Sequence, residues 1–265
     1  MPYENLTVER EEQIAIVKLN RPDKLNAISR ALHKEMVEAC EELRADDAVR
    51  AVIWTGAGRG FCSGADLTGA RPADAPQQGR QERLDEFGWV GHQAVGVYRL
   101  DKPTVAAVNG VAAGAGMSLA LACDLRVGCS ATRFKTVFIE RSLSPDSGMS
   151  YFLPRILGYS RAADLIFTSR MVDAEEAYRI GLLDRLVPGD GLLEEAKAVA
   201  RQIAFWPPVA MQMAKRVLQH SMEDTLESQL RYETLGLSFA RRAPHDVQEA
   251  GASFRERRPP VFTGE

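Results

Sequence analysis

The sequence lacks the features that mark membrane proteins, nucleic-acid-binding proteins and metal sites. No apolar run approaches the roughly 20 residues that span a bilayer, and residues 1–5 are polar, without a signal-peptide core. A net charge of −3 leaves no basic surplus for nucleic acid. The four histidines stand singly, without zinc-ligand spacing. We therefore expect a cytoplasmic protein with no metal and no membrane or nucleic-acid partner.

Cysteine is also scarce. None of the four cysteines belongs to a C-x-x-C pair: Cys40, Cys62, Cys123 and Cys129. Three of them lie among apolar or small residues, so we expect reduced, mostly structural thiols. The sequence also has no G-x-S-x-G elbow, and thus no signal for a serine nucleophile of that kind.

What the sequence does contain is an alternation of strand and helix patterns, in a composition that is 45% hydrophobic. This alternation over the first two-thirds predicts an α/β fold with a mostly parallel sheet and right-handed crossovers. Strands are expected at 13–19, 49–55, 104–108, 182–187 and, as a short extended segment, 132–138. The main helices are expected at 30–44, 81–100, 117–122, 145–158, 192–205, 209–220 and 224–241. We divide the chain into a core at 1–200 and a helical region at 201–265.

Several helices carry local signals. Ser29 and Ser160 stand where N-caps are expected, and Asp173 begins a capping-box spacing. The helix at 81–100 is expected to turn six side chains inward: Leu84, Phe87, Val90, Ala94, Val97 and Tyr98. The stretch 68–79 is rich in Pro, Gly, Ala and Gln, which predicts a mobile loop.

Two glycine-rich loops organise the chain. After the strand at 104–108, a turn leads to Gly114-Ala115-Gly116 and a helix that is apolar all round, as buried helices are. The loop at 56–67 follows the strand at 49–55 in the same way. A helix start leaves N–H groups unpaired and partially positive, and small residues let a ligand oxygen approach. One N–H from each loop can therefore converge on one oxygen and form an oxyanion site.

Neither loop has the pattern of a nucleotide site. Phe61 and Leu119 occupy the third glycine place of G-x-G-x-x-G, and neither loop contains the Gly-Lys-Ser/Thr of a P-loop. Glycine also permits tight turns without any ligand, and for one loop alone this simpler explanation has equal weight. Two such strand–loop–helix units are harder to attribute to turns alone.

Three motifs resemble those of the crotonase (enoyl-CoA hydratase/isomerase) superfamily. Residues 61–67 (FCSGADL) match F-x-x-G-x-D-L, residues 102–126 resemble K-P-x-I-A-A-V-x-G-x-A-x-G-G-G-x-x-L-A-x-x-C-D, and residues 19–27 (LNRPDKLNA) are similar to the first coenzyme A-contacting turn. The resemblance runs from about Val8 to Val187, and the helical tail also fits. It implies a spiral of β-β-α turns with a C-terminal helical trimerisation region.

The resemblance also assigns roles to residues. It places the oxyanion hole at the backbone N–H groups of Ala65 and Ala115, around the thioester carbonyl of an acyl-CoA. Coenzyme A enters as part of the substrate, so no separate cofactor is implied. Seven residues match coenzyme A-binding places: Lys24, Leu25, Ala27, Ser63, Ala65, Asp66 and Leu67. Lys24 can pair with a coenzyme A phosphate, although an ordinary solvated lysine is an equal alternative.

The sequence departs from the family where its hydratases carry two glutamates. Ser118 and Phe138 stand at those places, and neither is a carboxylate. Adding water across a double bond needs both activation of the water and protonation of carbon, which the family performs with that pair. We therefore doubt ordinary hydratase activity.

One carboxylate remains at a matching place. Pro145-Asp146-Ser147-Gly148 resembles the turn of the family's ring-opening and double-bond isomerases, in which the aspartate faces the acyl group and moves a proton. An aspartate before a helix is also a common N-cap. Both roles stay open for Asp146.

Four other side chains have weaker claims. Glu140 can turn inward, but a solvated or ion-paired residue beside Arg141 is the simpler interpretation. Ser118 can bind water or substrate, although a buried helical serine usually bonds its own backbone. Trp89 and His92 can line the acyl pocket, although core or surface positions are commoner.

These observations lead to one principal hypothesis. We expect an enoyl-CoA isomerase of fatty acid or aromatic acid metabolism, which shifts a double bond or rearranges a ring. Ala65 and Ala115 hold the thioester oxygen, and Asp146 moves the proton. The alternatives are an enoyl-CoA hydratase with an atypical active site and a non-catalytic acyl-CoA-binding protein. A homotrimer or a dimer of trimers is expected.

Overall fold

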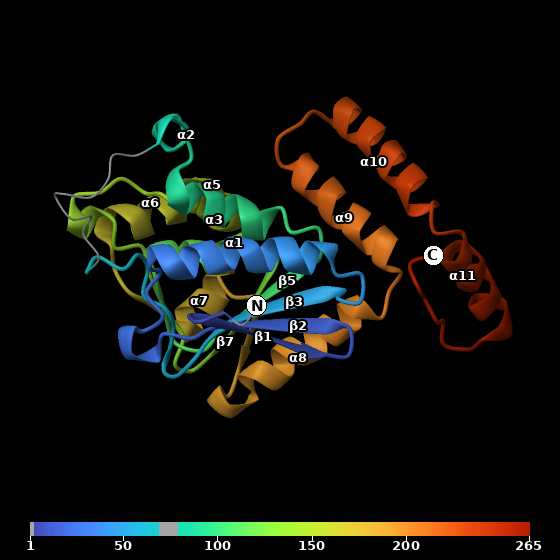
Figure 1. Cartoon of the computed structure of the whole chain (residues 1–265), viewed down its shortest axis with the longest axis horizontal. Coiled ribbons are helices and arrows are strands. Elements are labelled where there is room, and N and C mark those ends of the chain that lie inside the picture. Colours follow the sequence, from blue (N-terminus) through green and yellow to red (C-terminus); the bar gives the residue numbers. More distant parts are fainter. Residues whose placement is uncertain (1–2, 69–78) are drawn as a thin grey trace.

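The computed structural model describes residues 3–68 and 79–265, as two β-sheets flanked by helices and a helical tail that projects to one side (Figure 1). The larger sheet has the order β1 (Leu6–Glu11), β2 (Ile14–Leu19), β3 (Ala51–Gly56), β5 (Thr104–Val108), β7 (Leu125–Cys129) and β10 (Arg185–Val187). The smaller sheet has the order β4 (Gly60–Cys62), β6 (Val111–Ala113), β8 (Arg133–Lys135) and β9 (Val172–Asp173). Only β1 with β2 and β8 with β9 pair antiparallel among these strands, so the mostly parallel architecture is confirmed.

The helices cover both faces of the larger sheet. They are α1 (Arg30–Ala45), α2 (Arg80–Arg83), α3 (Gly88–Tyr98), α4 (Ala115–Ala122), α5 (Met149–Leu157), α6 (Tyr159–Thr168), α7 (Ala174–Ile180), α8 (Leu192–Ala204), α9 (Pro208–Ser221), α10 (Leu226–Ala240) and α11 (Pro244–Glu256). The described part of the chain also contains three short 3₁₀ helices: η1 (Pro22–Lys24), η2 (Ile139–Arg141) and η3 (Gly189–Gly191). In the described ranges no helix has both the length and the apolar character that crossing a bilayer requires.

The larger sheet separates two apolar cores, because side chains alternate between the faces of each strand. On β2, Ile14 and Ile16 join the core that contains the apolar face of α8. Ala15 and Val17 join the larger core on the other face, which contains side chains of α1, α3 and α4. Burial on both faces explains why these strands are almost continuously apolar.

Two of the three helix starts predicted from capping residues are confirmed. Ser29 and Asp173 cap α1 and α7, because each side chain accepts a hydrogen bond from the backbone N–H three residues on, at 3.2 and 2.9 Å. The expected cap at Ser160 is wrong: α6 begins directly after Gly158. Strand β1 and helix α11 were not expected. The predicted mobile loop lies almost wholly outside the described residues.

The continuous helix expected at 81–100 is also wrong. It is interrupted between α2 and α3, where Asp85 accepts a hydrogen bond from the Phe87 backbone N–H at 3.1 Å and Gly88 adopts a positive φ of 61°. That turn rotates the preceding side chains outward, so Leu84 and Phe87 are 73% and 63% exposed. Val97, in the second half, is buried as expected.

The four cysteines are buried and form no disulfide, as expected. Burial raises the pKa of the Cys40, Cys62 and Cys123 thiols to about 12. Thiols that remain protonated are poor nucleophiles. These side chains therefore serve packing.

Charged side chains dock the helical tail onto the sheets. The buried Lys215 ammonium on α9 donates to the Lys102 carbonyl at 3.0 Å and to the Asp124 carboxylate at 2.8 Å. Helix α10 packs along α9. The predicted boundary at residue 200 falls within α8, which packs on the larger sheet.

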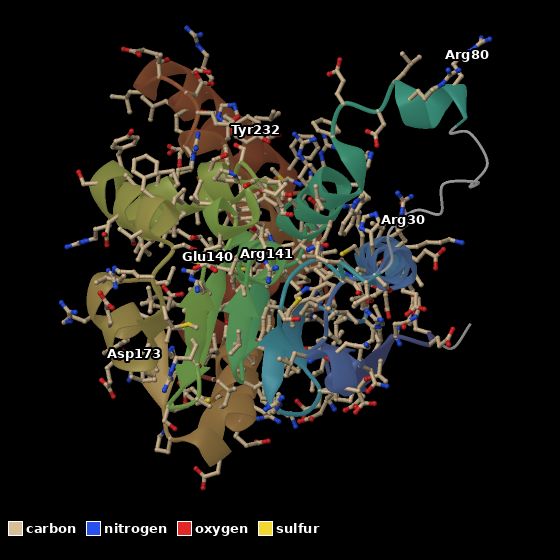
Figure 2. The ribbon with its side chains drawn as sticks, turned by 90° about the vertical axis from the view of Figure 1, so that its left-hand side faces the viewer. Arg30, Arg80, Glu140, Arg141, Asp173 and Tyr232 are labelled. Atoms are coloured by element: carbon tan, nitrogen blue, oxygen red, sulfur yellow. The ribbon has the colours of Figure 1, made fainter. Side chains whose placement is uncertain are left out.

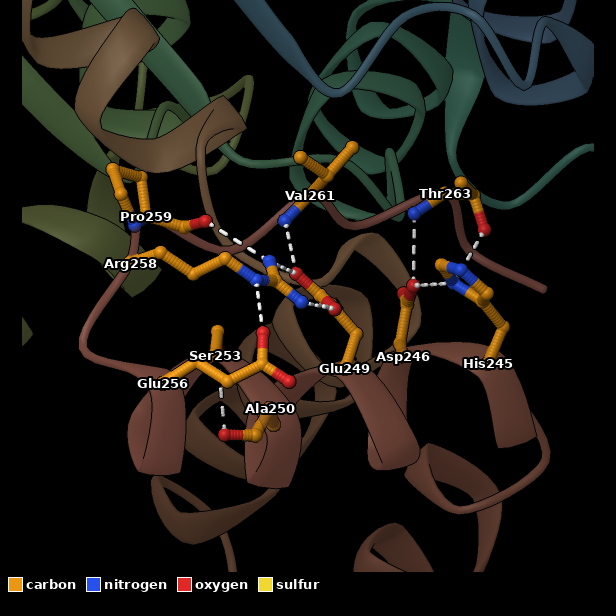
Figure 3. Close-up of polar contacts among 10 residues, drawn as sticks. All are labelled: His245, Asp246, Glu249, Ala250, Ser253, Glu256, Arg258, Pro259, Val261 and Thr263. Carbon is orange, nitrogen blue, oxygen red and sulfur yellow. Dashed lines mark hydrogen bonds and ion pairs between the residues drawn. The ribbon is translucent and has the colours of Figure 1, made fainter.

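The last residues of the chain fold back along α11 (Figure 3). The buried Asp246 carboxylate accepts hydrogen bonds from the backbone N–H groups of Thr263 and Gly264 at 2.8 and 3.0 Å. Glu249 pairs with Arg258 across the same turn. The tail is therefore fixed at both ends by polar contacts rather than by a deep apolar core.

Candidate active site

The two glycine loops meet at a cavity of about 370 Å³. One side is built from residues 63–67 and 114–115, which we call the amide wall. The other side is built from residues 137–146, which we call the turn wall. Lys24, Ala27 and Thr68 complete the lining.

The smaller sheet brings the two loops of the amide wall together. Strands β4 and β6 run parallel, so the loops that follow them leave from the same edge of the sheet. Ile28 then forms a bridge to Ala65: its N–H donates to the Gly64 carbonyl at 2.8 Å, and its carbonyl accepts from the Asp66 N–H at 2.9 Å. Since neighbouring N–H groups of an extended segment point in opposite directions, the Ala65 N–H is turned away from Ile28.

Two glycines allow the loops to approach this closely. A Cβ atom at Gly116 would lie 2.1 Å from the Cys62 carbonyl oxygen, so α4 begins in direct contact with the end of β4. Gly64 has a φ of 99°, and a Cβ atom there would lie 3.6 Å from the Ala115 backbone nitrogen. The backbones of the two loops are therefore in contact at the cavity.

The amides of Ala65 and Ala115 are both available to a ligand. Ala115 is the first residue of α4, where an N–H has no intrahelical partner. Neither amide donates a backbone hydrogen bond within the described ranges. The start of α4 adds a partial positive potential. The arrangement suits an oxygen that carries or develops negative charge.

Asp66 is a fixed anion at the rim of the amide wall. Its carboxylate pairs with Arg21 at 2.8 Å and accepts hydrogen bonds from the Thr68 hydroxyl at 2.5 Å and the Thr68 N–H at 3.0 Å. The Thr68 hydroxyl bond, followed by the Arg21 bond, lowers the pKa of Asp66 to about 2. Such a group is a poor proton carrier near neutral pH.

The other residues predicted to bind coenzyme A line the same cavity, with one exception. Lys24, Ala27, Ser63 and Leu67 line the cavity, and the Ser63 hydroxyl donates to the Lys24 carbonyl at 3.2 Å. Leu25 does not line it. Its carbonyl accepts from the Ser63 N–H at 2.9 Å, so it contributes through the backbone of the turn.

Asp146 lies on the turn wall and lines the cavity. Its carboxylate accepts a hydrogen bond from the Ser147 hydroxyl at 2.8 Å. The N-cap of α5 is Gly148, and no side chain caps that helix. The Asp146 carboxylate is therefore not occupied as a helix cap.

Two side chains at the glutamate places of the family behave differently from each other. Phe138 is buried and lines the cavity on the turn wall. Ser118 is buried but does not line it, and its hydroxyl has no hydrogen-bond partner in the part of the chain that is described. The expectation that Ser118 bonds its own backbone is thus wrong.

The remaining weak candidates lie outside the cavity. Glu140 pairs with Lys135 at 2.6 Å at the surface. His92 contacts Asp85 at 2.9 Å, and Trp89 packs edge-on against a histidine of α1. None of these side chains reaches the lining of this cavity, but Trp89 lines an adjacent cavity that also contacts Ala65, Asp66, Leu67 and Thr68.

Two arginines at the site were not predicted. Arg21 anchors Asp66, and Arg141 lines the cavity from the turn wall. Figure 2 shows Arg141 beside Glu140, and both belong to η2, the turn that follows β8. Arg21 lies within the motif at 19–27, but the motif did not indicate that its side chain pairs with Asp66, and Arg141 lies outside the three motifs.

Comparison with known proteins agrees with this geometry. The family described as enoyl-CoA hydratase/isomerase matches residues 9–265. The chain is 38% identical over 263 residues to the probable enoyl-CoA hydratase EchA12 of Mycobacterium tuberculosis (strain ATCC 25618 / H37Rv), covering 95% of this chain and 90% of that protein. It is 33% identical over 257 residues to the 1,2-epoxyphenylacetyl-CoA isomerase of Escherichia coli (strain K12), covering 96% of each.

The fold leads to the same family. The crystal structure of a probable enoyl-CoA hydratase/isomerase from Mycobacterium abscessus superposes with a TM-score of 0.89 at 36% identity, covering 99% of this chain and 100% of that one. The chain therefore belongs to the enoyl-CoA hydratase/isomerase, or crotonase, family, and its fold is the crotonase fold. It is an enzyme of that family acting on acyl-CoA. Its relatives are named hydratases more often than isomerases.

Proposed function

We propose that this enzyme is an enoyl-CoA isomerase. The observation that carries the proposal is the arrangement of carboxylates in the cavity. Asp66 is held by Arg21 and Thr68, whereas Asp146 forms no ion pair with any described residue and faces the same cavity as the two amides. Phe138 supplies no second base. One carboxylate is sufficient for isomerisation, because the proton removed at one carbon is returned at another.

In this proposal the thioester oxygen accepts hydrogen bonds from the N–H groups of Ala65 and Ala115. Asp146 removes a proton from C2 of a 3-enoyl-CoA, the C–H electron pair forms a C1–C2 double bond, and the carbonyl π pair moves onto the thioester oxygen. The protonated Asp146 then delivers the proton to C4: the oxygen pair re-forms the carbonyl, the C1–C2 π pair becomes the new C2–C3 double bond, and the C3–C4 π pair takes the proton, which leaves a 2-enoyl-CoA. One N–H donor directed at the oxygen stabilises such a negative charge by about 2.7–4 kcal/mol. The partial positive charge at the start of α4 adds to this stabilisation.

The coenzyme A part of the substrate is assigned to the amide wall. The Lys24 side chain forms no ion pair or hydrogen bond with the described residues, which leaves its ammonium group in the cavity available to a phosphate. Ala27, Ser63 and Leu67 offer a small-residue and apolar surface for the pantetheine arm.

The proposed reaction includes ring rearrangement as well as a double-bond shift. The E. coli relative is named for isomerising 1,2-epoxyphenylacetyl-CoA, which supports this broader scope. The proposed pathways are therefore aromatic as well as fatty acid metabolism.

The test is Asp146→Asn. We expect kcat for conversion of 3-enoyl-CoA into 2-enoyl-CoA to fall by about 10²–10⁴-fold, the usual contribution of a positioned acid or base. Affinity for a saturated acyl-CoA should change little, because the amide wall is intact. The matched control is Asp190→Asn, at an exposed carboxylate outside the cavity. Undiminished isomerisation in D146N would exclude Asp146 as the base.

Two alternatives give different results with the wild-type enzyme. An atypical hydratase, favoured by the names of most relatives, would add water to 2-enoyl-CoA faster than it isomerises 3-enoyl-CoA. A non-catalytic binding protein would bind acyl-CoA but would neither turn over these substrates nor exchange C2 protons with deuterium oxide. Proton exchange without hydration supports the isomerase.

We also propose that the chain assembles as a trimer or a pair of trimers through its tail. Helices α10 and α11 expose several apolar side chains: Leu226, Leu230, Leu237, Val247 and Phe254. Exposed apolar surface of this kind marks interaction sites. Sedimentation velocity measures the assembly directly, and a monomer at micromolar concentration would reject this part of the proposal.

A further inference from the structure

Arg141 places a guanidinium group on the turn wall of the cavity, beside apolar lining. It shares that wall with Val137, Phe138, Leu143 and Asp146. Among the described residues, Arg141 makes no hydrogen bond through its side chain and no ion pair. A guanidinium keeps its charge at all physiological pH values and offers five N–H donors in a planar fork.

The nearby carboxylates are engaged elsewhere. Glu140, the electrostatic neighbour of Arg141, is bonded to Lys135 at 2.6 Å. Asp146 accepts from the Ser147 hydroxyl and lies beyond ion-pair distance of Arg141. Asp66 is paired with Arg21 on the opposite wall. The charge of Arg141 is therefore not neutralised by an ion pair within the described chain.

The backbone holds Arg141 at a defined place. It is the last residue of η2, its N–H donates to the Phe138 carbonyl at 2.9 Å, and the Leu143 N–H donates to the same carbonyl at 3.0 Å. Ser142, with a φ of 54°, ends the turn. This short, bonded turn presents the arginine from the same wall as the proposed base.

Two cations line the cavity without an ion pair to any described residue, and they lie on different elements. Lys24 belongs to the η1 turn beside Ser63, next to the amide wall. Arg141 belongs to η2 and the turn wall. If coenzyme A lies along the amide wall, its phosphates meet Lys24, and the acyl group extends toward Phe138, Leu143 and Arg141.

We infer that Arg141 selects acyl-CoA substrates whose acyl chain ends in a carboxylate. Val137, Phe138 and Leu143 would contact the methylene part of the chain, and the guanidinium would bind the terminal carboxylate through two parallel hydrogen bonds. The inference rests on the proposed function, because it assumes that the acyl group lies along the turn wall. It deepens that proposal by naming the substrate class as mono-CoA thioesters of dicarboxylic acids.

The experiment compares two 3-enoyl-CoA substrates of equal chain length, one ending in a methyl group and one in a carboxylate. For the wild type, kcat/KM should be higher for the carboxylate-ended substrate. Arg141→Gln should lower that preference by about tenfold to a hundredfold, as expected for loss of a charge-assisted bidentate contact. Arg141→Lys should retain part of it. Arg179→Gln, at an exposed arginine of α7, is the matched control and should leave it unchanged.

A binding measurement separates this inference from the proposed reaction. Dissociation constants for the two corresponding saturated acyl-CoA thioesters and for free coenzyme A do not depend on turnover. Selective weakening of the carboxylate-ended ligand in R141Q supports the inference even if the enzyme is not an isomerase. Equal weakening of all three ligands would overturn it and assign Arg141 to a coenzyme A phosphate. An unchanged preference in R141Q would also overturn it.

Discussion

The two walls of the cavity are built in different ways. The amide wall uses backbone N–H groups, and its position follows from paired strands and from glycines that permit contact between Gly116 and Cys62. The turn wall uses side chains on irregular backbone, with positive φ values at Val137 and Ser142 and, directly after the wall, at Ser147. The chemistry of the first wall therefore depends on backbone position, which its glycines maintain, whereas the chemistry of the second depends on which side chains it carries.

This difference separates the stabilisation of an enolate oxygen, which the family shares, from the proton transfer that distinguishes its members. Two converging amides can stabilise an enolate oxygen whatever happens to the proton afterwards. The fate of the proton depends on which side chains stand opposite: here Phe138, Arg141 and Asp146. A family match therefore establishes the thioester site more firmly than it establishes hydration or isomerisation.

The largest effect is expected from breaking the amide wall with Gly116→Ala. The new Cβ atom would lie 2.1 Å from the Cys62 carbonyl oxygen, so α4 must move and carry the Ala115 N–H away from the ligand. We expect kcat/KM to fall by about 10²–10³-fold, as for loss of one oxyanion donor. Deuterium exchange at C2 of a bound acyl-CoA measures the effect.

Gly96→Ala on α3 is the matched control, because the nearest atom to its new Cβ is the Cys40 sulfur at 4.0 Å. This variant should keep full activity. If G116A were as active as G96A, the close contact would not position the oxyanion donor.

A smaller effect is expected on the turn wall with Val137→Gly. Val137 is β-branched and has a φ of 58°, an unfavourable conformation for such a residue. Relief of about 1–3 kcal/mol of strain should offset most of the packing lost with the side chain. The free energy of unfolding in urea should therefore stay within about 1 kcal/mol of the wild type.

The comparison for V137G is Val108→Gly in the buried strand β5, where no strain is relieved. That change should cost about 2–4 kcal/mol, as large-to-small core substitutions do. Equal losses in the two variants would mean that Val137 is not strained.

The smallest effect concerns pH and the charge at the rim of the amide wall. Asp66 has its pKa lowered from 3.8 to about 2 by Thr68 and Arg21, so its ionised form stabilises the folded state. That contribution is fully present above about pH 4 and is lost as pH falls through about 2. Asp66→Asn should therefore be less stable than the wild type at pH 6, and the difference should shrink by pH 2.

Urea unfolding at pH 6, 4 and 3 measures this difference, and the exposed Asp190→Asn variant serves as the control. A stability gap between D66N and the wild type that did not change between pH 6 and pH 3 would show that the Asp66 ion pair is not the cause.

How far each part could be predicted depends on how local its signal is. Ser29 and Asp173 were predicted as caps because a cap bonds a backbone group only three residues away. The interruption between α2 and α3 was missed, since apolar spacing continues through a turn that Asp85 and Gly88 impose. Arg141 was missed because no local pattern marks it. Its place in the cavity depends on the tertiary fold.

The sequence by itself determined the two strand–loop–helix units and, through their glycines and motifs, the two amides that face the cavity. It could do so because a backbone N–H takes its direction from strand pairing and from the start of a helix. Only the tertiary structure decided that the Asp146 carboxylate is free of a cap, that Glu140 pairs with Lys135, and that Arg141 lines the cavity. The directions of these side chains depend on turns with positive φ and on contacts between residues that no sequence motif links. No short sequence pattern therefore predicts them.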